Sequence, residues 1–101
     1  MLTSKQRAYL KGEANQMETI LIVGKGGISD DVVQQAVDAL RKREMIKGKV
    51  LETSPQPPRE IAEEIAARTG AEVVQVIGTK FILYKQNPKE PIYKLPKVKK
   101  A

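Results

Sequence analysis

The first 24 residues predict a short helix, from its end signals, and then a strand, from a run of apolar residues. Residues 2–14, LTSKQRAYLKGEA, begin with Thr3 or Ser4 as a candidate helix N-cap, and Gly12 is expected to break this helix. Residues 19–24, TILIVG, form a continuous apolar run of strand length. Such a run is typical of a strand that is covered on both sides or lies in the middle of a sheet.

A second helix is predicted after the glycine-rich segment, with Ser29 as its N-cap. Its apolar residues follow the spacing i, i+3, i+4, i+7 and form one stripe of Val33, Ala36, Val37 and Leu40. Residues 45–52, MIKGKVLE, alternate apolar positions with lysines, which predicts a strand with one face toward the core. A third helix is predicted in REIAEEIAARTG, between the prolines of SPQPP and Gly70, with Ile61, Ile65 and Ala66 pointing inward.

Two short apolar runs, EVVQVI and KFILYK, flank Gly78 and Thr79. A two-residue loop with glycine first is typical of a type II′ hairpin. The predicted order of elements is therefore α-β-α-β-α-β-β. Because helices connect the first three strands, we expect these strands to be parallel, and the hairpin adds an antiparallel fourth. The predicted fold class is a small layered α/β domain with a four-stranded mixed sheet.

The 101 residues are enough for one hydrophobic core, and we expect a single domain over residues 1–86. Residues 87–101, NPKEPIYKLPKVKKA, have neither a helical nor a strand period and are expected to form a basic tail. The whole chain has a formal charge of +6, and six of its 18 basic side chains lie between Lys85 and Ala101. Such a tail can attract polyanions or keep a protein soluble, and composition alone does not separate these two roles.

Two missing residue types restrict the chemistry. The chain has no cysteine and no histidine, so thiolates and the commonest general base and metal ligand are absent. We therefore expect no catalytic residues, no metal site and no cofactor. The sequence has no run of 18 or more apolar residues and no charged-then-apolar leader. On this basis we expect a cytoplasmic protein that does not contact membranes. We also expect it to be a monomer.

The segment GKGG at residues 24–27 lies between a predicted strand and a predicted helix. Because glycine has no Cβ, this segment can bring backbone amides close to a ligand and can adopt positive φ. The N-terminus of the following helix favours an anion such as phosphate. The spacing fits neither a P-loop nor a dinucleotide-binding motif, but it fits the G-x-x-G clamp of KH-type modules. The alternative is a tight turn selected only for its conformation, and Asp30 and Asp31 would repel a phosphate placed close to them.

The chain resembles the YhbY-like proteins, the stand-alone bacterial form of the CRM (chloroplast RNA splicing and ribosome maturation) domain, in the segments LTSKQRAYLKG, ILIVGKGGIS, MIKGKV, ARTGAEVVQVIGTKFILYK and IYKLP. This resemblance implies an RNA-binding domain related in fold to the C-terminal domain of translation initiation factor 3. It implies association with precursors of the large ribosomal subunit, and RNA contacts at Gly24, Lys25, Gly26 and Gly27. The sequence departs from the family at Gly48, where the family often has a larger apolar residue.

Three functions are open at this point. In the favoured one, the protein binds precursor rRNA in pre-ribosomal particles, the loop holds a backbone phosphate, and counter-charge comes from Lys5, Lys11, Lys47 and Lys49. Base stacking is expected to be limited, since the chain has three tyrosines and one phenylalanine. The second is a protein-interaction adaptor that uses the acidic outer side of the third helix, formed by Glu60, Glu63 and Glu64. The third is an enzyme that holds a phosphorylated small molecule at the glycine loop, although no convincing acid and base accompany that loop.

Overall fold

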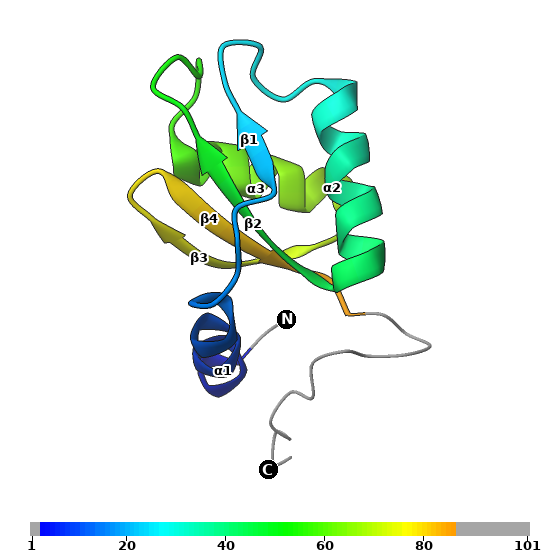
Figure 1. The fold of residues 1–101 in the computed structure, drawn as a ribbon, viewed down its shortest axis with the longest axis vertical. Coiled ribbons are helices and arrows are strands. Elements are labelled where there is room, and N and C mark those ends of the chain that lie inside the picture. Colours follow the sequence, from blue (N-terminus) through cyan, green and yellow to red (C-terminus); the bar gives the residue numbers. More distant parts are fainter. Residues whose placement is uncertain (1–2, 87–101) are drawn as a thin grey trace.

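The computed structural model describes residues 3–86 of the chain, which form a four-stranded sheet with helices on both faces (Figure 1). The helices are α1 (Ser4–Ala14), α2 (Asp30–Arg43) and α3 (Pro58–Thr69). The strands are β1 (Leu21–Val23), β2 (Met45–Val50), β3 (Glu72–Ile77) and β4 (Lys80–Tyr84). The predicted order of elements is confirmed. The predicted tail of residues 87–101 lies outside the described residues.

The sheet has the strand order β1-β2-β4-β3. β1 and β2 are parallel, whereas β4 is antiparallel to both of its neighbours, β2 and β3. The first three strands therefore run in one direction and the fourth against them, which confirms the predicted mixed sheet. The turn between β3 and β4 has a positive φ of 56° at Gly78, as a hairpin with glycine first requires.

β1 lies at one edge of the sheet, so the prediction of a strand covered on both sides or central in the sheet was wrong. Among residues 3–86 its hydrogen-bonded neighbour is β2 alone, and β4 lies on the other side of β2. Leu21 and Val23 are buried, but Ile22 between them is 58% exposed. The continuous apolar run thus combines one buried strand face with an isoleucine that faces solvent.

Two apolar clusters hold the helices to opposite faces of the sheet. The larger cluster joins α2 and α3 to one face and contains Ala36, Leu40, Ile61, Ile65 and Phe81 among its buried residues. The smaller cluster joins α1 to the other face through Leu10, Ala14, Met45, Val74, Ile82 and Tyr84. We call this second face the α1 side of the sheet. Ile61, Ile65 and Ala66 of α3 are buried as predicted.

Two details of the predicted helices are wrong. α1 continues past Gly12 to Ala14, because Leu10 and Ala14 are fully buried against the sheet and hold the last turn, while Gly12 lies on the exposed side.

In α2, Ala36 and Leu40 are buried as predicted, whereas Val33 and Val37 are only half-buried. Val32 and Ala39 also pack against the core, so the buried stripe is turned relative to the predicted one.

The junction between α2 and β2 is formed by Glu44, a non-glycine residue with φ of 66°. Its amide donates to the Leu40 carbonyl over 2.8 Å, and its carbonyl accepts from the Lys85 amide over 2.8 Å. Glu44 is fully buried beside the phenol of Tyr84. Burial of the phenol, together with the negative charge of Glu44, raises the pKa of Tyr84 to about 12.

This raised pKa predicts a loss of stability at alkaline pH. The folded protein holds the Tyr84 proton more tightly than the unfolded chain, whose tyrosine pKa is about 10. The resulting stabilisation is fully present below pH 10 and is lost as the pH rises toward 12. Urea unfolding between pH 9 and 12 should therefore show a shallower decline for Tyr84→Phe than for the wild type. Identical pH dependence of the two proteins would contradict this account.

Candidate nucleic-acid interface

The loop at residues 24–27 connects β1 to α2 and forms a tight turn at one end of the sheet (Figure 1). The amide of Gly27 donates to the carbonyl of Gly24 over 2.9 Å. Gly27 has φ of 64°, a conformation that favours glycine. Lys25 and Gly26 are exposed at the tip of this turn.

The three glycines of the loop meet different surroundings. A Cβ at Gly24 would lie 3.2 Å from Cδ1 of Leu51, and one at Gly27 would lie 3.2 Å from Cγ of Pro55. A Cβ at Gly26 would have no atom within 4 Å. The turn conformation and the neighbouring segment after β2 thus explain Gly24 and Gly27. A side chain at Gly26 would instead point into open space.

The backbone at the tip is available to a ligand. Within residues 3–86, the amides of Lys25 and Gly26 take part in no hydrogen bond, while the Gly27 amide is used in the turn itself. α2 begins directly after the loop, with the Ser29 hydroxyl accepting from the Val32 amide over 3.3 Å. Free amides beside a helix N-terminus can hold an anionic oxygen.

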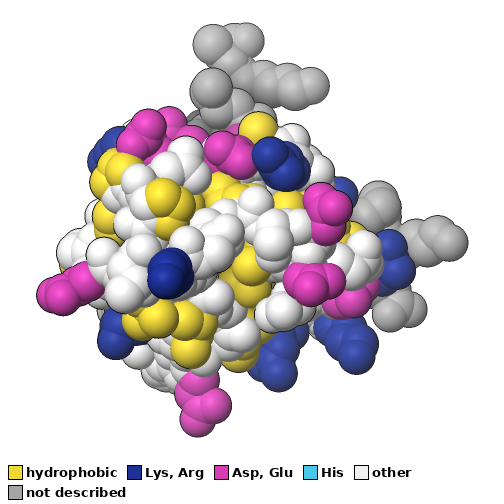
Figure 2. Space-filling model, turned by 90° about the horizontal axis from the view of Figure 1, so that it is seen from above, with side chains coloured by type: hydrophobic (Ala, Val, Ile, Leu, Met, Phe, Trp, Pro, Cys, Tyr) yellow, Lys and Arg dark blue, Asp and Glu magenta, His cyan; other side chains and the backbone are white. Residues whose placement is uncertain are grey.

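The charge at this end of the molecule is mixed. Asp30 and Asp31 in the first turn of α2 are exposed, as is Lys25. Viewed from this end, basic and acidic side chains are interspersed around the rim, and apolar and uncharged atoms cover much of the middle (Figure 2). An anion held here would therefore depend on backbone amides and on Lys25 more than on a continuous positive surface.

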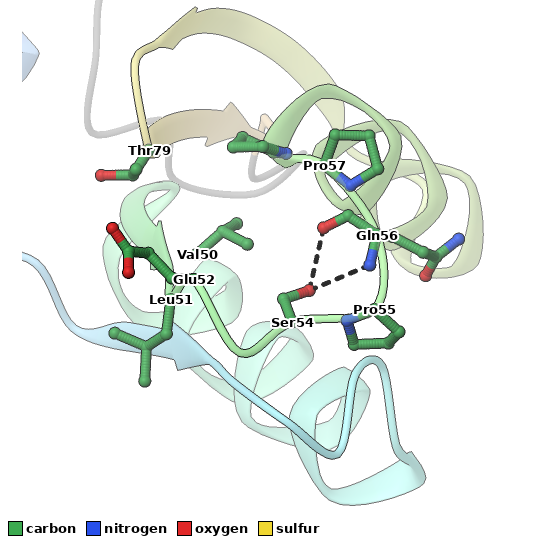
Figure 3. A pocket seen from close by; sticks show the side chains of 9 residues that line it. Val50, Leu51, Glu52, Ser54, Pro55, Gln56, Pro57 and Thr79 are labelled. Carbon is green, nitrogen blue, oxygen red and sulfur yellow. Dashed lines mark hydrogen bonds between the residues drawn. The ribbon is translucent and has the colours of Figure 1, made fainter.

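A hollow of about 230 Å³ lies beside the loop, between the segment after β2 and the β3–β4 turn (Figure 3). Ser54 shapes it by donating to the Gln56 carbonyl over 2.9 Å and accepting from the Gln56 amide over 3.3 Å. Of the described residues that line it, Glu52 alone is charged, and the others are apolar or uncharged, such as Pro55 and Thr79. This hollow would repel a phosphate, so it is a poor pocket for a phosphorylated small molecule.

The four predicted lysines outside the loop fall into two groups. Lys47 and Lys49 lie on β2, and their side chains are on the α1 side of the sheet, since Ile46 and Val50 belong to the opposite face. Lys49 is directly beside Ile22 of β1, two residues before the loop. These two lysines therefore share a surface that begins next to the glycine turn.

Lys5 and Lys11 lie on α1, at the opposite end of the molecule from the glycine loop (Figure 1). Lys11 lines a hollow of about 450 Å³ along β3, together with Arg7 from α1 and Arg59 and Glu63 from α3. The Nε atom of Arg7 is buried there without a hydrogen-bond partner among residues 3–86. The structure thus does not bring all the predicted basic residues together at the loop.

The sequence reasoning missed Lys80, which follows the hairpin turn and pairs directly with Lys49. It also missed Arg7 and Arg59 beside Lys11. The register of the hairpin could have placed Lys80 on one face with Lys47 and Lys49, but only once β4 was known to lie next to β2.

A sheet of order β1-β2-β4-β3 with two helices on one face, one on the other and a G-x-x-G turn after β1 defines a class of small α/β domains. The chain belongs to the CRS1 / YhbY (CRM) domain family, whose model matches residues 2–85. The family resemblance stated from the sequence is therefore confirmed.

Individual relatives agree with this assignment. The chain is 35% identical over 96 residues to the Bacillus subtilis protein named "Probable RNA-binding protein YqeI", which covers 95% of this chain and 100% of that protein. It is 31% identical over 91 residues to a Haemophilus influenzae protein named "RNA-binding protein", with 90% and 92% covered. The solution structure of Staphylococcus aureus SAV1595 matches with a TM-score of 0.80 at 38% identity, over 95% of this chain and 100% of that one. The family and these names confirm the prediction that the chain is not an enzyme.

Proposed function

We propose that the protein binds RNA through the tip of the glycine loop and the lysines on the α1 side of the sheet. The observation that carries this proposal is the open tip, where the amides of Lys25 and Gly26 have no partner among residues 3–86 and no atom lies within 4 Å of the Cβ position of Gly26. A nucleic-acid backbone can approach such a surface closely, as in G-x-x-G clamps that hold single strands. The names of the relatives support RNA as the ligand.

In this proposal the loop positions one phosphate, and the lysines supply attraction that depends on salt. Lys25 stands at the tip, and Lys47 and Lys49 stand on β2 beside the strand that leads into the loop. Lys5 and Lys11 on α1 would contact only more distant parts of a long RNA. Phe81 and Tyr84 are buried, so recognition depends on the backbone and on shape more than on aromatic stacking.

The RNA in this proposal is precursor rRNA of the large ribosomal subunit, met in pre-ribosomal particles by a cytoplasmic monomer. Residues 1–86 would form the RNA-binding domain, and residues 87–101 would add non-specific attraction through five lysines. To test it, the protein is crosslinked to RNA in cells, and the extract is separated by sedimentation. Recovery with large-subunit precursors is the expected result, and migration free of RNA would overturn the proposal.

The adaptor alternative has less support from the structure. Of the three glutamates expected to make the outer side of α3 acidic, Glu64 pairs with Arg68 over 2.9 Å. Arg59 and Arg68 are both exposed on this helix, so its surface is mixed rather than acidic. A mixed surface offers no charge complementarity to a particular partner.

Replacing Lys25 with alanine should weaken binding to a large-subunit precursor RNA fragment about three- to fivefold, because one phosphate contact is lost. Lys25 is exposed in a turn, so the unfolding temperature should not change. Fluorescence anisotropy and thermal unfolding measure the two quantities. Lys42→Ala, at an exposed position on α2, is the matched control and should bind like the wild type. An equal loss in both variants would show that only net charge matters.

A further inference from the structure

One half of the α1 side of the sheet is not covered by α1. There, a row of four side chains crosses all four strands in the order Ile22, Lys49, Lys80, Ile77, as the strand register places each beside the next. Lys49 and Lys80 are exposed, and Ile22 and Ile77 are 58% and 60% exposed. With neighbouring strands about 4.8 Å apart, this row is roughly 14 Å long.

The row lies open because α1 packs further along the same face. α1 covers Met45, Val74 and Tyr84, and it ends at Ala14. Between the end of α1 and the row lies a hollow of about 180 Å³, lined by Asn15, Lys47, Gln75, Ile77, Lys80 and Ile82. The apolar side chains of Ile77 and Ile82 therefore share this hollow with the lysines Lys47 and Lys80.

The charge on this surface has one sign. Lys47, Lys49 and Lys80 form no ion pair within residues 3–86. Within the described part of the chain, neither the row nor the lining of the hollow contains an acidic residue. Neighbouring lysines with an exposed isoleucine at each end of the row suit a ligand that carries negative charges and apolar flat groups, which is the chemistry of single-stranded nucleic acid.

The row also begins at the proposed clamp. Ile22 lies two residues before Gly24, and Leu51, which follows β2 and is 39% exposed, lies against Gly24. A strand whose phosphate is held at the loop tip can therefore continue onto the sheet without leaving the surface. A four-stranded sheet face of this width accommodates two or three nucleotides in other RNA-binding folds.

We propose that the uncovered half of the α1 side is a second part of the RNA site and holds two or three unpaired nucleotides that continue from the glycine loop. This inference rests on the proposed function. Lys49 and Lys80 neutralise phosphates, while Ile22 and Ile77 pack against bases. Because aliphatic side chains contact any base, this surface selects single strands over duplexes without selecting a base sequence.

The test compares labelled 12-nucleotide oligouridine with a 12-base-pair RNA duplex, by fluorescence anisotropy at several salt concentrations. Lys80→Ala and Ile77→Thr should each weaken oligouridine binding about five- to tenfold and duplex binding less than twofold. Lys80→Ala should also reduce the slope of log K against log salt by about 0.7, whereas Ile77→Thr should leave the slope unchanged. Lys42→Ala is the control and should match the wild type, and unchanged unfolding temperatures exclude loss of fold.

The outcomes separate the two proposals. If the wild type binds neither RNA, both are overturned. If the wild type binds oligouridine and both row variants bind it equally well, only the sheet surface is overturned. Equal losses for oligouridine and duplex would show that the surface does not select single strands. Displacement of the oligouridine by a poly-glutamate peptide of equal charge would show a general site for acidic segments, and would also overturn the inference.

Discussion

Replacing Gly48 with alanine is expected to lower the free energy of unfolding by about 1–3 kcal/mol, although alanine is normally the more favourable residue inside a strand. Gly48 on β2 pairs directly with Phe81 on β4. A Cβ at position 48 would overlap Cζ of Phe81, whose side chain is fully buried in the larger cluster. The ring cannot move aside without displacing its packed neighbours.

A double-mutant cycle measures this effect. Urea unfolding is compared for the wild type, Gly48→Ala, Phe81→Leu and the double variant. Phe81→Leu alone loses packing, but it removes the ring that the new methyl group meets. The double variant should therefore be more stable than the sum of the two losses predicts, by about 0.5–3 kcal/mol. Additive losses would show that the ring does not require glycine.

The same pair explains why a glycine stands in the middle of β2 at position 48. An aromatic ring placed over a cross-strand glycine takes up the space of the missing side chain. The sequence shows a glycine in a strand and a phenylalanine in a hairpin, but it does not show that they face each other. That relation depends on β4 lying next to β2, which is a property of the tertiary fold.

Local patterns were sufficient to predict the order and direction of the elements. Ser29 and Gly70 begin and end their helices because caps act through neighbouring backbone groups. Gly12 was misjudged because helix propensity is weak compared with the burial of Leu10 and Ala14. The edge position of β1 was missed because an apolar run does not record which strands flank it.

The candidate site was predictable only where its residues are contiguous in the sequence. The G-x-x-G turn is a contiguous segment, so its position between a strand and a helix follows from local patterns. The basic surface is assembled from lysines of β2 and β4, and these come together only through strand register. Lys80 was missed for this reason, while Lys5 and Lys11 were grouped with a loop from which the fold separates them.

Replacing Gly26 with aspartate is expected to weaken binding to a large-subunit precursor RNA fragment at least about tenfold, with no change in the unfolding temperature. The new carboxylate would stand at the loop tip, where the free amides of Lys25 and Gly26 are proposed to meet a phosphate. Gly26 is the loop glycine that tolerates a side chain, since no atom lies within 4 Å of its Cβ position. Gly27 is unsuitable because its φ of 64° would add backbone strain.

Two further variants test other causes of a loss in affinity. One adds a side chain without a charge at the loop tip, and the other changes the net charge away from the loop. Gly26→Asn adds a side chain of the same size without charge, and it should retain more affinity than Gly26→Asp if repulsion of a phosphate is the cause. Gln35→Glu makes the same change in net charge at an exposed position of α2, and it should bind nearly like the wild type. Anisotropy titrations of the three variants, with thermal unfolding of each, make the comparison. Wild-type affinity in Gly26→Asp would rule out the clamp and leave the tight turn as the reason for the glycines.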